Sequence, residues 1–113
     1  MIDMSSSEQI VRDVAASMRR GIETVGGRLL ITNKRLLFQA HALNIQKLPA
    51  EIPYNNISEI RRFKNLGIVN NGASIILNSG MEYKFILNKT GEIIKIINEL
   101  LDASRKGEYQ KDK

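Results

Sequence analysis

The stretch GGRLLITNKRLLFQAHALN, residues 26–44, decides the fold of this chain. Within it, residues 28–32 and 35–40 are rich in Leu, Ile and Phe, contain no Gly or Pro, and flank Asn33-Lys34. Asn adopts a positive φ at little cost, which a two-residue hairpin turn requires. The pattern therefore predicts the central hairpin of a small antiparallel barrel. The stretch holds no catalytic set of residues.

The totals indicate one soluble globular domain. The chain has 113 residues, of which 42% are hydrophobic and 26% charged, and these values suit a single folded core. It has no cysteine, which excludes disulfides and thiolate metal sites and is compatible with a reducing cytoplasm. No apolar run reaches the length of a membrane span, and no signal-peptide pattern is present. We therefore expect a cytoplasmic protein.

The charge balance is basic, with a formal net charge of +5 and a sequence pI of about 9.7. A basic balance favours anionic partners, which can be lipid headgroups, nucleic acid or an acidic protein. The same charge also serves solubility, so it does not by itself establish a ligand.

Further strands are predicted after the central hairpin. Residues 50–54 read as a short strand at a sheet edge, because Pro53 cannot donate to a ladder. Residues 58–64 continue as a strand, and Asn70-Asn71-Gly72 indicates a turn. Residues 73–78 and 81–87 then form a hairpin around Ser79-Gly80.

The two ends of the chain differ in how clearly they can be interpreted. Residues 8–20 carry Ile10, Val14 and Met18 at helical spacing, which taken alone favours a helix, although a strand stays open there. Near the other end, Thr90 is a plausible N-cap for an amphipathic helix that runs to about residue 104. We expect a flexible N-terminus at 1–7, one domain at 8–104, and a charged tail at 105–113.

A run of motifs in order resembles the GRAM domain of the pleckstrin-homology-like (PH-like) superfold, and most of all small bacterial GRAM-domain proteins. The matching segments run from about residue 8 to residue 102 and include Arg20-Gly21-Ile22-Glu23, Val25-Gly26-Gly27, residues 30–38, residues 41–46, Glu51-Ile52-Pro53, Ile57-Ser58-Glu59-Ile60, residues 66–72 and residues 80–85. The resemblance implies a mainly β fold: a seven-stranded antiparallel, two-sheet PH-like barrel capped by one C-terminal amphipathic helix. It also implies that residues 8–18 form the first strand, and that the chain is a binding module rather than an enzyme.

Two basic clusters are candidate sites for anionic lipid. Antiparallel alternation places the connections after the first and third strands at one barrel end, where phosphate could accept several charge-assisted hydrogen bonds. The residues expected there are Arg19, Arg20, Arg28, His41 and Lys47. A secondary patch consists of Arg61, Arg62 and Lys64, which alternate between the two faces of one strand.

The sequence also bears on partners other than lipid and on catalysis. Residues Ile52, Pro53 and Tyr54 form a candidate edge strand for a protein partner or a second copy of the chain. Nucleic acid is not favoured, because aromatic residues make up only 5% of the chain. His41 is the only histidine, and the glycine spacing fits no nucleotide-binding motif, so we expect no metal, no cofactor and no catalysis.

The sequence therefore predicts a non-enzymatic module that associates weakly with anionic membrane lipids, at the inner face of the membrane. The alternative is a module for protein interaction or homo-oligomerisation without a lipid ligand.

Overall fold

The computed structural model describes residues 7–20, 23–41 and 50–106. In chain order its elements are β1 (Ile10–Arg20), β2 (Glu23–Thr32), β3 (Arg35–Ala40), β4 (Ala50–Pro53), the 3-10 helix η1 (Tyr54–Asn56), β5 (Ile57–Asn65), β6 (Val69–Leu77), β7 (Glu82–Leu87) and α1 (Thr90–Arg105). Every strand pair is antiparallel. The seven described strands form one sheet in the order β4-β3-β2-β1-β7-β6-β5.

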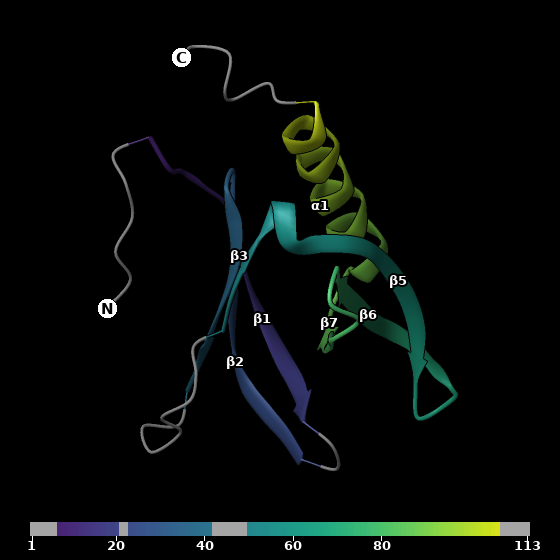
Figure 1. Ribbon diagram of the computed structural model, residues 1–113. Helices are drawn as coiled ribbons and strands as arrows, with labels where there is room; N and C mark the ends of the chain where they lie inside the picture. Colours follow the sequence, from purple (N-terminus) through teal and green to yellow (C-terminus); the bar gives the residue numbers. More distant parts are fainter. Residues whose placement is uncertain (1–6, 21–22, 42–49, 107–113) are drawn as a thin grey trace.

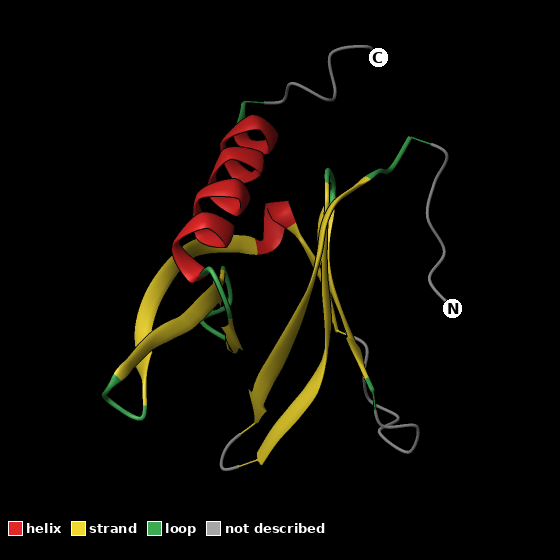
Figure 2. Ribbon diagram, turned by 180° about the vertical axis from the view of Figure 1, so that it is seen from behind, coloured by secondary structure: helices red, strands yellow, loops and turns green. Residues whose placement is uncertain are grey.

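The sheet bends into two halves that share the β1–β7 pairing. Strands β1 to β4 form one half and β5 to β7 the other, and α1 lies over one end of the space between them (Figures 1 and 2). The helix packs against β5, β6 and η1. Strands β4 and β5 stand at the two edges of the sheet, so the barrel is not closed. Seven antiparallel strands and a single C-terminal helix confirm the predicted fold class.

Apolar side chains from both halves meet beneath the helix. Phe38 of β3 and Phe85 of β7 lie with ring centroids 5.6 Å apart, and both are almost fully buried. Helix α1 contributes the buried residues Ile93, Ile97 and Leu101, one apolar stripe at helical spacing. Each such side chain stabilises the fold by about 1.5–3 kcal/mol when buried. The helix therefore covers one end of the open barrel.

Several local predictions are confirmed. Residues 10–20 are a strand, as the family resemblance implied, because they pair with β2 on one side and with β7 on the other. The helix that the apolar spacing alone favoured is therefore wrong. The turn between β2 and β3 consists of Asn33 and Lys34. Gly80 has a φ of +96° in the connection between β6 and β7, as a tight turn there requires.

Two other local predictions are wrong. Residues 70–72 are not a turn: they belong to β6, and Gly72 pairs with Phe63 and Ile86. Thr90 does not cap α1, because it is already helical and its hydroxyl donates to the carbonyl of Leu87 at 2.8 Å. The residue before the helix is Lys89, which has a φ of +54°.

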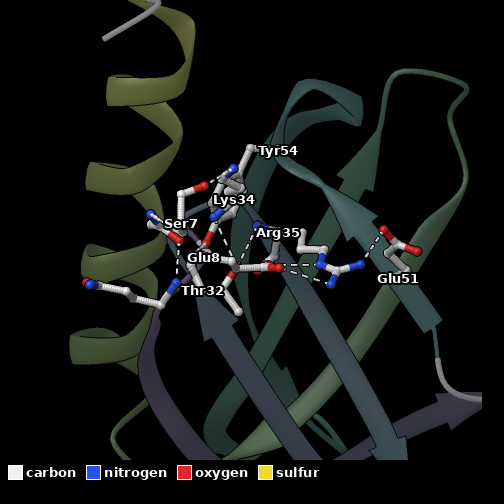
Figure 3. A network of polar contacts seen from close by, with 9 residues as sticks. Ser7, Glu8, Thr32, Lys34, Arg35, Glu51 and Tyr54 are labelled. Atoms are coloured by element: carbon white, nitrogen blue, oxygen red, sulfur yellow. Dashed lines mark hydrogen bonds and ion pairs between the residues drawn. The ribbon is translucent and has the colours of Figure 1, made fainter. Parts of the chain in front are cut away.

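A partly buried ion pair links the chain ahead of β1 to the β2–β3 hairpin (Figure 3). The Arg35 guanidinium donates to both carboxylate oxygens of Glu8, at 2.8 and 3.0 Å, and reaches Glu51 at 2.8 Å. The Thr32 hydroxyl donates to Glu8 at 2.7 Å. Burial raises the pKa of the Glu8 carboxyl, but the bonds from Arg35 and Thr32 outweigh it, so the pKa lies below its ordinary value. Glu8 is therefore ionised at neutral pH, and the pair with Arg35 is kept.

Candidate functional site

The structure separates the residues of the first predicted cluster. Arg19 lies near the end of β1 and donates to the side-chain oxygen of Asn65 at 3.4 Å. His41 follows β3, is exposed, and donates its backbone N–H to Gly26 at 2.9 Å. Arg28 lies farther along β2 and is paired with Asp13 at 2.9 Å. Lys47 and the side chain of Arg20 lie outside the described residues.

The second cluster divides between the two faces of β5. Arg61 and Arg62 pair with consecutive residues of β6, so their side chains leave the strand on opposite sides. Arg61 forms an ion pair with Glu59 at 2.6 Å. Arg62 donates to the backbone carbonyl of Asn70 at 3.1 Å, and Lys64 is exposed.

The cations of the described residues differ in whether they have an acidic partner. Four guanidinium groups form ion pairs with carboxylates, namely those of Arg12, Arg28, Arg35 and Arg61. No ion pair within the described part of the chain involves Arg19, Arg62, Lys64 or Lys84, nor Lys34 at the β2–β3 turn or the four cations on and beside α1, which are Lys89, Lys95, Arg105 and Lys106.

Arg19, Arg62, Lys64 and Lys84 lie on, or reach to, the β5–β6 hairpin. Arg62 pairs in the row of Ala73 and Phe85, so Arg62 and Lys64 lie on the face of β5 toward α1, whereas Lys84 and Arg19 lie on the opposite face. The four cations thus border the hairpin on both faces, and we call them the basic hairpin surface.

Lys84 was missed by sequence reasoning. It lies beside Arg19 in the β1–β7 pairing, and its ammonium group lies 5.3 Å from the ring centroid of Phe63 on β5. The alternation of β7 indicated that Lys84 points away from the core. Its neighbours depend on the register of two other strands, however, which the sequence does not show. Glu82, the nearest acid along β7, accepts a hydrogen bond from Ser74.

The turn between β5 and β6 lies within this surface and is apolar. The exposed fractions of Leu66, Ile68 and Val69 are 78%, 79% and 50%. Leu66 and Gly67 have φ values of +55° and +72°, and the N–H of Ile68 donates to Asn65 at 3.1 Å. Positive φ at both central residues defines a type I′ turn. Leucine in this conformation is strained by about 1–2 kcal/mol.

Next to the hairpin, an open cavity of about 350 Å³ lies between β1, β2 and the ends of β6 and β7. Its lining includes Gly26, Gly27, His41, Asn71 and Asn88. The side-chain oxygen of Asn71 is fully buried there and accepts no hydrogen bond from the described residues. A hydroxyl group or a water molecule is the kind of donor this oxygen needs.

The candidate edge strand, β4, exposes main-chain groups to a partner, whereas two of the three predicted contact side chains are buried. Strand β4 does stand at an edge of the sheet. Ile52 and Tyr54 are each only 2% exposed, and the Tyr54 hydroxyl donates to the carbonyl of Thr32 at 2.6 Å. A partner at this edge would therefore meet the main chain of β4 and Pro53, which has no N–H to donate.

The described ranges hold neither a cluster of metal-ligand side chains nor a helix suited to span a membrane. Residues 7–20, 23–41 and 50–106 contain no cluster of three or more His, Asp or Glu side chains that could hold a metal ion. Of the helices described there, none is long and apolar enough to span a bilayer.

Comparison with known proteins identifies the family. The sequence-family model for the GRAM domain matches residues 1–105 of this chain. The chain belongs to the GRAM domain family. This agrees with the resemblance found in the sequence, and such domains are in general non-enzymatic binding modules. A search of curated proteins gives no match for this GRAM domain.

Solved structures share the fold at low sequence identity. The C-terminal domain of an unknown protein from Leishmania infantum has a TM-score of 0.73 at 15% identity, covering 85% of this chain and 86% of that one. The Vps36 N-terminal PH domain has a TM-score of 0.73 at 10% identity, covering 91% and 86%. The Slm1-PH domain in complex with inositol-4-phosphate has a TM-score of 0.57 at 9% identity, covering 81% and 93%. The GRAM domain described here thus has the PH-like fold.

Proposed function

We propose that this GRAM domain is a non-enzymatic module that associates weakly with anionic membrane lipids through its basic hairpin surface. One observation carries the proposal. Four of the cations that form no ion pair in the described residues, Arg19, Arg62, Lys64 and Lys84, gather at one hairpin. The other described cations without an ion pair lie at the β2–β3 turn or on and beside α1, where Glu92, Glu99 and Asp102 lie among them. Because no described carboxylate neutralises the four cations of the hairpin, their charge is available to phosphate groups.

The expected affinity follows from the number of charges. Each basic residue near an anionic bilayer contributes about 1 kcal/mol. Four such residues give about 4 kcal/mol, which corresponds to a dissociation constant of about 1 mM. Charge alone therefore gives weak, salt-sensitive binding at the cytoplasmic face of a membrane.

A second set of residues supports the same ligand class. His41 and the unpartnered oxygen of Asn71 line the cavity beside the hairpin, where a headgroup hydroxyl could donate to that oxygen. A structural neighbour, the Slm1-PH domain, was solved with inositol-4-phosphate. The alternative is a protein ligand or a second copy of the chain at the β4 edge, which would use backbone hydrogen bonds.

The experiment is co-sedimentation of the purified chain with vesicles of phosphatidylcholine alone and with vesicles that also contain phosphatidylserine, whose negative surface attracts basic segments. We expect binding to the anionic vesicles only, falling steeply as salt rises from low to physiological concentration, because exposed charges are screened. Absence of binding to anionic vesicles at low salt would refute the proposal and favour the protein-ligand alternative.

A further inference from the structure

We infer that the turn between β5 and β6 inserts Leu66 and Ile68 into the apolar boundary of the membrane that the basic hairpin surface meets. This inference rests on the proposed function and deepens it: charge brings the domain to an anionic bilayer, and the turn anchors it there. The occupant of this apolar surface is therefore the lipid itself.

The first argument is the grouping of exposed apolar side chains. Leu66, Ile68 and Val69 are all at least half exposed and lie in or directly after the turn between β5 and β6. Figure 1 shows this turn at the free end of the β5–β6 hairpin. The other large apolar residues of comparable exposure in the described chain, Ile10 and Met81, are single and lie elsewhere. Isolated exposed residues are normal on a protein surface, but a contiguous group indicates contact with another apolar phase.

The second argument is the backbone of the turn. A type I′ turn favours Asn, Asp or Gly at its first central position, because these residues tolerate a positive φ. Leu66 occupies that position with a φ of +55° and is 78% exposed. Burial in the core therefore does not explain this leucine, and asparagine would suit both the backbone and the solvent better. A residue that folding disfavours at an exposed tip points to a function at that tip.

The third argument is the charge beside the turn. Lys64 directly precedes the turn, Arg62 donates to Asn70 just after it, and Arg19 donates to Asn65 at its start. An apolar tip bordered by cations matches the two layers of an anionic bilayer, with the cations at the headgroups and the tip below them. It does not match a second copy of the same surface, because the cations would repel one another.

The test combines vesicle binding with thermal stability for Leu66→Asn and Ile68→Ser, each in the full chain. We expect each variant to bind vesicles that contain phosphatidylserine about tenfold more weakly, because an inserted side chain loses apolar contact. Leu66→Asn should melt at the same temperature as the original chain or higher, because asparagine relaxes the turn. Met81→Asn, which removes an exposed apolar side chain elsewhere, should bind as the original chain does.

The outcomes separate the two proposals. Should the original chain bind anionic vesicles and both turn variants bind equally well, the insertion is refuted and the electrostatic association stands. Should the original chain not bind at all, the proposed function fails and the insertion fails with it. A loss of binding in Met81→Asn as large as in the turn variants would also refute a specific role for the turn.

Discussion

Replacing Lys64 and Lys84 together by glutamate should weaken binding to anionic vesicles by about 1000-fold, while the domain stays folded. Each substitution removes an attraction of about 1 kcal/mol and adds a repulsion of similar size, so the pair changes the binding free energy by about 4 kcal/mol. Both side chains are exposed, and neither takes part in an ion pair of the described structure, so the cost to folding is small. Co-sedimentation at low salt, with a thermal melt of each protein, measures both effects.

The matched control is Lys95→Glu with Lys106→Glu, which changes the net charge equally but at α1 and the residue after it. The helix lies away from the β5–β6 turn (Figure 1). We expect this control to lose less than about tenfold, through long-range charge alone. An equal loss in both double variants would show that net charge, rather than the basic hairpin surface, governs binding.

Gly27→Ala should destabilise the fold by about 3 kcal/mol, which lowers the melting temperature of a domain of this size by about 15 °C. A Cβ atom on Gly27 would lie 2.1 Å from the backbone oxygen of Gln39 and 2.9 Å from Cα of Ala40. Both are main-chain atoms of the neighbouring strand β3, so the strands must move apart to make room. Thermal unfolding followed by circular dichroism measures the effect.

The adjacent glycine provides the control for this variant. A Cβ atom on Gly26 would meet only the His41 ring, at 3.9 Å, which is an ordinary contact. Gly26→Ala should therefore change the free energy of unfolding by less than about 1 kcal/mol. The change is stabilising where the lower conformational entropy of the unfolded chain is the larger effect. If the two substitutions destabilise the fold equally, the close approach of β2 and β3 at Gly27 is contradicted.

The fold was largely predictable because its main signals are local. The Asn33-Lys34 turn and the two apolar runs beside it need no information from distant residues. Residues 10–20 were ambiguous, since their apolar spacing suits a helix as well as a strand. These residues form a strand because they pair with both β2 and β7. At the level of sequence, only the family resemblance indicated a strand there.

The turn between β5 and β6 shows why a strong local signal can fail. Asn70-Asn71-Gly72 is a better turn sequence than Leu66-Gly67, yet the chain turns at the latter. Gly72 is needed inside the ladder, because the Phe63 ring covers it so closely that a Cβ atom would lie 2.4 Å from that ring. Cross-strand packing thus outweighs the local preference.

The candidate site was less predictable than the fold, because it depends on which charges neutralise one another. Arg28 and Asp13 lie on different strands, and their ion pair follows from the β1–β2 register. Lys84 joins the basic hairpin surface through pairings of β7 with β1 and β6. A list of basic residues in the sequence does not separate paired charges from available ones.

The most direct test of the membrane orientation uses a single tryptophan, since the chain has none of its own. Ile68→Trp places the reporter in the β5–β6 turn, and Met81→Trp places one just before β7, at the opposite end of β6. On vesicles with phosphatidylserine, we predict that the emission of Trp at position 68 shifts to the blue and is quenched by brominated lipids, while that at position 81 does not change. A shift at position 81 with none at position 68, in protein bound to the vesicles, would contradict the proposed membrane-facing surface.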